Sequence, residues 1–320
     1  MKSCGDNGER LLEAVWPALA FAVLYELLLY GMEHGLGVVN RMLIVGGADA
    51  AVLAFQTVHA ADYQALFAAA GMSVSLAVIL RFCIRRGEIG FTRHLRGDAL
   101  TNGAAVIGGL CLGMFLNGAL SSAGSSAAQG TGTAAQGAVV SPLVGIAVYG
   151  VLTPLAEESI FRGVTLTRLY EVLLRVLPEK GKTHALNDFG RSTDQQANEG
   201  DNFGNPEIDF APNRKLKSWK DMAFWLAAAA SSVLFGVYHG NLLQGIYAAC
   251  MGLAFCCLLR LTENLGAAVL AHGAMNVLTL VFSQKGAYNE LSNPSFLAAM
   301  LGISVCCGGF VVIRRRMLYC

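Results

Sequence analysis

Residues 103–120, GAAVIGGLCLGMFLNGAL, decide the fold class, because they form an apolar stretch without a single formal charge. They lie inside a longer run, Ala99–Ala156, that also lacks Lys, Arg, Asp and Glu. Apolar residues make up 54% of the chain and charged residues 14%, whereas a soluble domain carries about 25%. A water-soluble helix needs charged side chains on its exposed face, so the sequence predicts an all-α, polytopic membrane protein. The net charge of +1 excludes a strongly basic nucleic-acid binder.

Eight stretches are long and apolar enough to be transmembrane helices, which need about 20 mostly apolar residues. We therefore expect eight spans, at Leu11–Tyr30, Leu66–Ile84, Gly103–Leu120, Ser141–Phe161 or longer, Met222–Tyr238, Leu242–Leu261, Leu265–Phe282 and Phe296–Ile313. The apolar stretch Leu43–Val58 contains Asp49 and is followed by His59, so we expect an interfacial helix there and not a ninth span. Most of the nine cysteines lie in apolar stretches, where cysteine is a small packing residue.

The connections between these spans are alternately basic and uncharged. Ser121–Gly137 has no charge, whereas the second, fourth and sixth connections and the C-terminus carry Lys and Arg, for example Arg85, Arg86, Lys180, Lys182, Arg260 and Arg314. Because basic loops stay in the cytoplasm, we expect both termini to be cytoplasmic, in the cell membrane if the source is prokaryotic. Glu179–Asp221 is rich in polar residues, and its composition predicts a flexible cytoplasmic insert.

The chain therefore divides into three parts. Residues 1–140 form about three N-terminal spans, and residues 141–283 form a core that the polar loop 179–221 interrupts. Residues 284–320 supply the last span and a basic C-terminus. The chemistry-bearing residues of the apolar spans fall in the middle part, so we expect the functional site there.

Ionisable side chains within a span cost at least about 2–3 kcal/mol each, so each one needs a reason. The first pattern is Glu157-Glu158-Ser159-Ile160-Phe161-Arg162, in which Glu158 and Arg162 are four apart and can pair on one helix face. Glu157 is turned about 100° away from that face and has no such partner. A carboxylate in a partly dry cavity suits a general base.

Two further patterns lie in later spans. Phe235 and His239 are four residues apart, as are His272 and Asn276, and each pair lies on one helix face. Taken singly, each pattern also has a structural interpretation, as an interfacial ion pair, a helix cap or an interhelical hydrogen bond. Three such patterns on three spans favour one shared site with a base, two imidazoles and an amide.

The ordered trio E-E-x-x-x-R, F-x-x-x-H and H-x-x-x-N resembles the CPBP family of intramembrane proteases, which includes type II CAAX prenyl proteases and bacteriocin-processing (Abi) proteins. The motifs are Glu157, Glu158 and Arg162, then Phe235 and His239, then His272 and Asn276. The resemblance covers about Ser141–Phe282 and implies an α-helical fold. It also implies an endopeptidase that acts on a membrane-associated substrate, such as a prenylated C-a-a-X tail or a bacteriocin-like peptide.

The same resemblance implies the residue roles. Glu157 and His239 would activate water, His272 and Asn276 would stabilise the oxyanion, and Glu158, Arg162 and Phe235 would support them. A divalent metal such as zinc, held by Glu157, His239 and His272, would complete a three-ligand catalytic site. We favour direct activation by glutamate and histidine without a cofactor, and H-E-x-x-H is absent.

The depth of His239 in the membrane decides whether this site can form. If the fifth span enters at Met222, His239 lies near the far surface, away from Glu157 and His272. The motifs meet only if this helix starts outside the hydrocarbon, with Arg214–Lys220 in a protruding helix, or ends early at Gly240-Asn241.

Two functions from other classes remain as alternatives. A proton-coupled transporter would need further charges along a path to both surfaces, and the uncharged run Ala99–Ala156 argues against it. A non-catalytic membrane scaffold or immunity protein would keep its function without Glu157.

Overall fold

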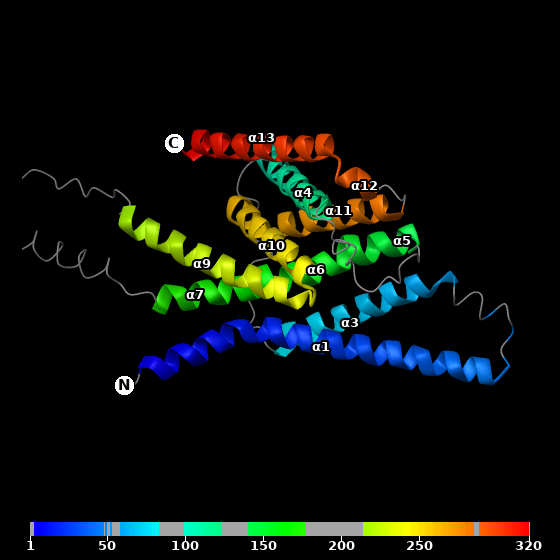
Figure 1. Ribbon diagram of the computed structural model, residues 1–320. Coiled ribbons are helices and arrows are strands. Elements are labelled where there is room, and N and C mark those ends of the chain that lie inside the picture. Colours follow the sequence, from blue (N-terminus) through cyan, green and yellow to red (C-terminus); the bar gives the residue numbers. More distant parts are fainter. Residues whose placement is uncertain are drawn as a thin grey trace, which may run out of the picture.

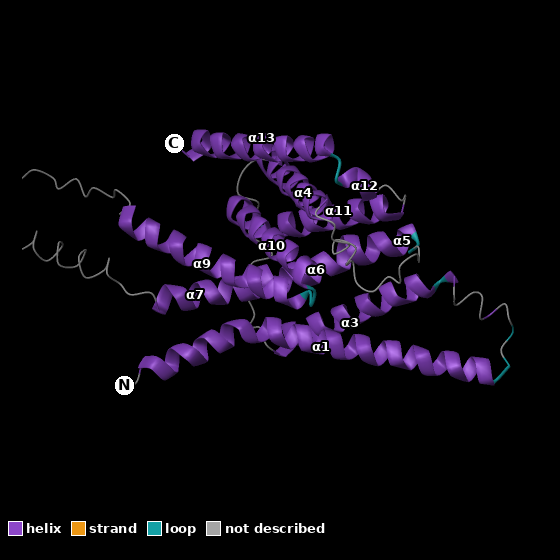
Figure 2. Cartoon of the chain, in the orientation of Figure 1, coloured by secondary structure: helices purple, strands orange, loops and turns teal. Residues whose placement is uncertain are grey.

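The computed structural model describes residues 3–47, 49, 52, 58–82, 99–122, 140–176, 214–284 and 288–319. This part of the chain folds into helices and contains no strand (Figure 2). Eight helices are long and apolar enough to cross a membrane, and each overlaps one of the eight predicted spans. The all-α polytopic fold class predicted from the sequence is therefore confirmed, and the protein is a multi-pass integral membrane protein.

Seven of these helices are single elements, and the eighth consists of several. The single elements are α1 (Ser3–Val45), α3 (Ala60–Phe82), α4 (Ala99–Ser122), α9 (Arg214–Tyr238), α10 (Leu242–Thr262), α11 (Leu265–Gln284) and α13 (Pro294–Tyr319). The eighth runs through α5 (Pro142–Gly145), η2 (Ile146–Leu152), α6 (Thr153–Glu158), η3 (Ser159–Thr165) and α7 (Leu166–Val176), and we call it the motif helix. A short helix, α12 (Tyr288–Leu291), precedes α13.

The motif helix lies between two layers of the bundle (Figure 1). On one side α1 packs along α3, and on the other α4 packs along α13, with α10 and α11 beside the centre. The N- and C-termini lie at the same end of the molecule as the end of α7 and the start of α9 (Figure 1). An even number of membrane spans requires both chain ends to lie on the same side of the membrane. This arrangement therefore supports the prediction that the two termini share one side.

Two predicted segments differ from the described helices. α1 runs on to Val45 and so includes the start of Leu43–Val58, whereas half of that proposed interfacial helix lies outside the described residues. The polar insert 179–221 also lies outside them, except for residues 214–221, which form the start of α9. The prediction that Arg214–Lys220 belongs to the fifth helix is confirmed.

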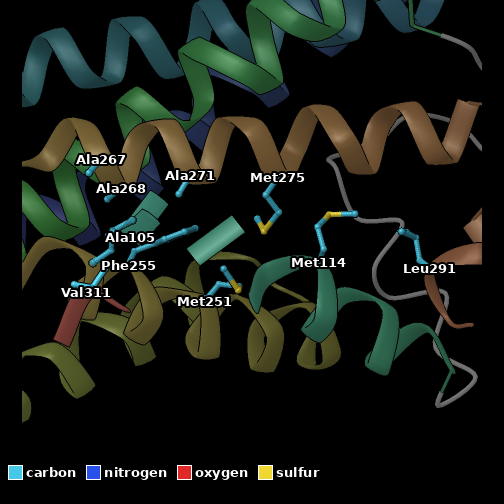
Figure 3. Close-up of a cluster of buried hydrophobic side chains, with 11 residues drawn as sticks. Ala105, Met114, Met251, Phe255, Ala267, Ala268, Ala271, Met275, Leu291 and Val311 are labelled. Atoms are coloured by element: carbon cyan, nitrogen blue, oxygen red, sulfur yellow. The ribbon is translucent and has the colours of Figure 1, made fainter. Parts of the chain in front are cut away.

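Small side chains allow the central helices to approach closely. Ala267, Ala268 and Ala271 of α11 are buried against Phe255 and Met251 of α10, as Figure 3 shows. A side-chain carbon at Gly273 would lie only 2.1 Å from the Gly150 carbonyl oxygen of the motif helix. Such backbone-to-backbone contacts are typical of membrane helices, whose association depends on close van der Waals packing.

Two side chains fix the N-terminal end of the motif helix. The Ser141 backbone N–H donates to Asp62 Oδ1 of α3 at 2.7 Å, and Gln284 Nε2 of α11 donates to the Val140 carbonyl oxygen at 2.7 Å. Because the first N–H groups of a helix have no partner within it, the Asp62 carboxylate supplies a cap from another helix. The motif helix is thus anchored between α3 and α11.

Candidate active site

Glu157 and Glu158 are the last two residues of α6, which lies between the π-helical segments η2 and η3. In η2 the Thr153 N–H donates to the Val148 carbonyl five residues earlier, as a π-helix requires. π-helical turns are rare and are frequent at functional sites. Glu157 is 5% exposed and Glu158 is fully buried, so the turns place two carboxylates inside the bundle.

Glu158 and Arg162 form the predicted pair. Arg162 Nη1 lies 3.2 Å from Glu158 Oε1, and both side chains are fully buried. The guanidinium carbon of Arg162 stacks over the Phe235 ring at 4.1 Å, a cation–π contact that adds to the pairing. The predicted supporting role of Phe235 therefore has a geometric basis in its contact with Arg162.

His272 contacts both carboxylates from α11. Its Nδ1 lies 2.9 Å from Glu158 Oε1 and its Nε2 lies 3.8 Å from Glu157 Oε2. The Glu158 carboxylate beside Arg162 accepts this hydrogen bond, so Nδ1 of His272 carries a proton and Nε2 faces Glu157. The Phe255 ring stacks on this imidazole at 5.0 Å between centroids and fixes its plane.

His239 lies in the turn between α9 and α10, and this turn is in the middle of the molecule, not at its end (Figure 2). Gly240 adopts φ +67°, a conformation that favours glycine, and the Asn241 side chain caps the start of α10. The sequence set two alternative conditions for assembly of the motifs, and the structure has the early helix end that one of them required, because α9 begins at Arg214 and ends at Tyr238, just before Gly240-Asn241.

The Phe235 ring links His239 to the rest of the site. Ring centroids are 4.7 Å apart for Phe235 and His239, and 6.2 Å apart for Phe235 and His272. His239 Nδ1 lies 2.8 Å from the Phe235 carbonyl oxygen. His239 is therefore a neighbour of the cluster and is not separated from it by the width of the membrane.

Asn276 lies one turn after His272 on α11 and binds the backbone of the motif helix. Its Nδ2 donates to the Tyr149 carbonyl oxygen at 3.1 Å. The structure thus brings the seven predicted site residues to one region. Glu157, Glu158, Arg162, Phe235 and His272 are in mutual contact, and His239 and Asn276 lie at two edges of the cluster.

The proposed metal ligands do not form a metal-binding group. Among the described residues, no three His, Cys, Asp or Glu side chains gather closely enough to hold a metal ion. The hydrogen bonds of the two imidazoles, to Phe235 and to Glu158, use Nδ1 and leave Nε2 as the nitrogen that a metal would bind. Because Glu157, His239 and His272 are not gathered as a metal-binding group, we derive no step through a metal.

Several residues of the site were not identified from the sequence. Phe255 stacks on His272, Tyr149 accepts from Asn276, and the rings of Tyr25 and Tyr238 lie 6.2 Å apart at the edge of the cluster. The Tyr238 ring also lies 5.5 Å from the Phe161 ring and 5.4 Å from the His239 ring, between centroids. The N-terminal part of the chain thus contributes Tyr25 of α1 to the site, although no motif in it pointed to this role.

Comparison with known proteins agrees with the motifs. Residues 139–278 match the model of a protein family described as type II CAAX prenyl endopeptidase Rce1-like. No curated protein and no solved structure matches the chain. The matched range includes the seven predicted site residues. Residues 139–278 are therefore similar to the Rce1-like family of type II CAAX prenyl endopeptidases, and this match confirms the resemblance predicted from the motifs.

Proposed function

We propose that the protein is an intramembrane endopeptidase in which Glu157 and His239 activate water for attack on a peptide carbonyl. The observation that carries this proposal is the convergence of Glu157, His272 and the Phe235–His239 pair from three separate helices. A buried carboxylate beside imidazoles is the arrangement that general acid–base hydrolysis requires.

His239 is the group suited to share the water proton with Glu157. A carbonyl oxygen can only accept, so the hydrogen bond to Phe235 puts the proton of neutral His239 on Nδ1. The lone pair is then on Nε2, where it can take a proton. As the water oxygen bonds to the carbonyl carbon, its proton passes to Glu157 or His239, and the C–N bond then breaks as the leaving amine takes that proton.

His272 and Asn276 are the donors that we assign to the oxyanion. A protonated His272 Nε2 would offer an N–H beside Glu157, while its Nδ1 stays on Glu158. The Asn276 amide has two N–H groups, of which one donates to the Tyr149 carbonyl. The second is available for the oxyanion, and one such donor commonly contributes about 3–4 kcal/mol to transition-state stabilisation.

The distribution of buried charge supports hydrolysis over proton transport. Among the described residues, the buried ionisable acids, bases and imidazoles are Glu157, Glu158, Arg162 and His272, and all four belong to one cluster. A relay across the membrane would need further ionisable groups along a path to both surfaces. A single compact cluster instead suits one reaction centre.

The family description supports a C-terminal, CAAX-type prenylated peptide as the substrate. The isoprenoid chain would hold the substrate in the bilayer, so that the scissile bond reaches the site from within the membrane. Unlipidated and bacteriocin-like peptides are the alternatives that an assay must separate.

The experiment compares cleavage of farnesylated CAAX, unlipidated CAAX and bacteriocin-leader peptides by the purified protein in lipid nanodiscs. Glu157→Gln and His239→Ala should each lower kcat at least about 100-fold on the cleaved peptide, because each removes a proton acceptor. Cleavage that persists in both variants would refute the mechanism. Specific binding of a peptide without cleavage by the wild type would instead indicate a scaffold.

Two matched controls are available on α1. His34 Nδ1 lies 3.0 Å from the Tyr30 carbonyl four residues earlier, the same local contact that His239 makes with Phe235. His34→Ala should therefore leave cleavage near the wild-type rate, and so should Glu33→Gln. A loss of activity in either control would indicate a general effect on the fold.

A further inference from the structure

The backbone of the motif helix lacks a donor just before the two glutamates. In an α-helix the Tyr149 carbonyl would accept from Thr153 N–H, but that group donates to the Val148 carbonyl. In a π-helix it would accept from residue 154, which is proline and has no N–H. Neither helical register therefore supplies a partner for the Tyr149 carbonyl, although the residue is only 9% exposed.

Asn276 fills this position from another helix. Its Nδ2 donates to the Tyr149 carbonyl at 3.1 Å, and a polar backbone group within a membrane needs such a partner. The Asn276 contact lies about one turn along α11 from Gly273, whose backbone meets that of Gly150 in η2. This backbone contact and the Asn276 hydrogen bond both hold α11 against η2.

We infer that Asn276 is a positioning residue whose carboxamide replaces the donor missing at Pro154 and holds the π-helical turn that sets Glu157 against His272. Hydrogen bonds join residues five apart in a π-helix and four apart in an α-helix. A change from one pattern to the other in η2 would therefore rotate every following side chain about the helix axis. Glu157 follows Pro154 by three residues, and its 3.8 Å contact with His272 depends on that rotation. This role is additional to the oxyanion contact, and its effect on catalysis rests on the proposed function.

A double-mutant cycle tests the replacement of the donor without any substrate. Asn276→Ala should lower the thermal midpoint of the detergent-solubilised protein by at least about 2 °C when residue 154 is proline. In a Pro154→Ala background the new backbone N–H can bind Tyr149, so the same substitution should have less than half of that effect. Equal effects in both backgrounds would overturn the inference.

Asn117→Ala is the matched control. Asn117 Nδ2 of α4 donates to Thr279 Oγ1 at 3.0 Å, so this residue also binds α11 through a buried carboxamide. Its substitution should lower the thermal midpoint equally with proline or alanine at position 154, because its partner is independent of the motif helix. Coupling of Asn117 to residue 154 would indicate a general effect of Pro154→Ala.

Hydrogen exchange keeps the inference testable if Pro154→Ala does not fold. Asn276→Ala should speed amide exchange in peptides that cover residues 149–158 at least about tenfold, whereas Asn117→Ala should not. Unchanged protection of this segment in Asn276→Ala would contradict the bracing role.

The pH profile of cleavage separates positioning from oxyanion binding. Loss of an oxyanion donor lowers kcat/KM at every pH by the same factor, whereas a displaced Glu157 changes the shape of the profile. We expect Asn276→Ala to shift the acidic limb of the profile by at least about half a pH unit. In the double variant with Pro154→Ala, the limb should return to its wild-type position. An acidic limb that does not shift in Asn276→Ala would refute the positioning role. If the wild type cleaves no peptide, the proposed function is refuted, and the double-mutant cycle of thermal midpoints still tests whether Asn276 braces the turn.

Discussion

Replacement of Arg162 tests whether the buried ion pair stabilises the fold or only serves the site. Arg162→Met removes the arginine that pairs with Glu158 and leaves, among the described residues, His272 as the remaining partner of this fully buried carboxylate. Breaking a buried pair by removing one partner typically costs about 3–5 kcal/mol. The lost stacking over Phe235, at 4.1 Å, contributes about 1 kcal/mol to that cost.

The second variant removes both charges. Glu158→Gln with Arg162→Met should recover at least half of the lost unfolding free energy, because no uncompensated charge remains. Glu158 Oε2 also has no hydrogen-bond partner among the described residues, so the hydrogen-bonding capacity of the native pair is not fully used. Replacing both charged side chains should therefore cost little unfolding free energy. The assay is reversible unfolding in mixed micelles with increasing SDS, followed by tryptophan fluorescence.

Activity should not follow stability in this pair of variants. The double variant cannot hold the His272 Nδ1 proton on a carboxylate, so cleavage should stay at least about 100-fold below wild type despite the recovered stability. If the double variant is as unstable as Arg162→Met, the uncompensated charge is not the cause of the loss. If its cleavage recovers along with its stability, Glu158 does not orient His272.

The other predictions concern packing, capping and metal. Gly273→Ala should abolish cleavage and lower the thermal midpoint by several degrees, because the added side-chain carbon would clash with the Gly150 carbonyl oxygen. Gly302→Ala is the control and should have no effect, since nothing lies within 4 Å of a side-chain carbon at that position. Asp62→Ala should lower the unfolding free energy by about 1 kcal/mol in the SDS assay, because the hydrogen bond from the Ser141 N–H is lost. Asp62→Asn should keep most of the wild-type stability, because its side-chain oxygen can still accept this hydrogen bond. Incubation with EDTA should leave the cleavage rate of the wild type within about twofold of the untreated protein, because the proposed activation of water by Glu157 and His239 uses no metal.

The spans and the partners of the motifs could be predicted from the sequence because both depend on local composition and spacing. The i,i+4 spacing of Glu158 and Arg162 fixes their common face, and the pair forms as expected. The same spacing puts His239 next to Phe235. The position of the α9–α10 turn was predictable only as one of two alternatives, and the structure has the helix end before Gly240 that this alternative required.

The long-range contacts could not be predicted from spacing. His272 was expected at an oxyanion, and its 2.9 Å contact with Glu158 depends on how α11 packs against the motif helix. The π-helical segments lie in an apolar sequence in which only Pro154 marks an irregular backbone. Tyr25 comes from α1, more than a hundred residues before Glu157, and its apolar surroundings gave no signal of a role.

The arrangement of charges explains why Glu157, and not Glu158, can serve as the base. Glu158 lies 3.2 Å from Arg162 and 2.9 Å from His272, so its Oε1 already accepts from two charged or polar donors. Glu157 makes a longer contact, 3.8 Å from its Oε2 to His272 Nε2, which is beyond the range of a hydrogen bond. Among the described residues it is thus the carboxylate of the two that no hydrogen bond holds, and two adjacent acids acquire different roles from their surroundings.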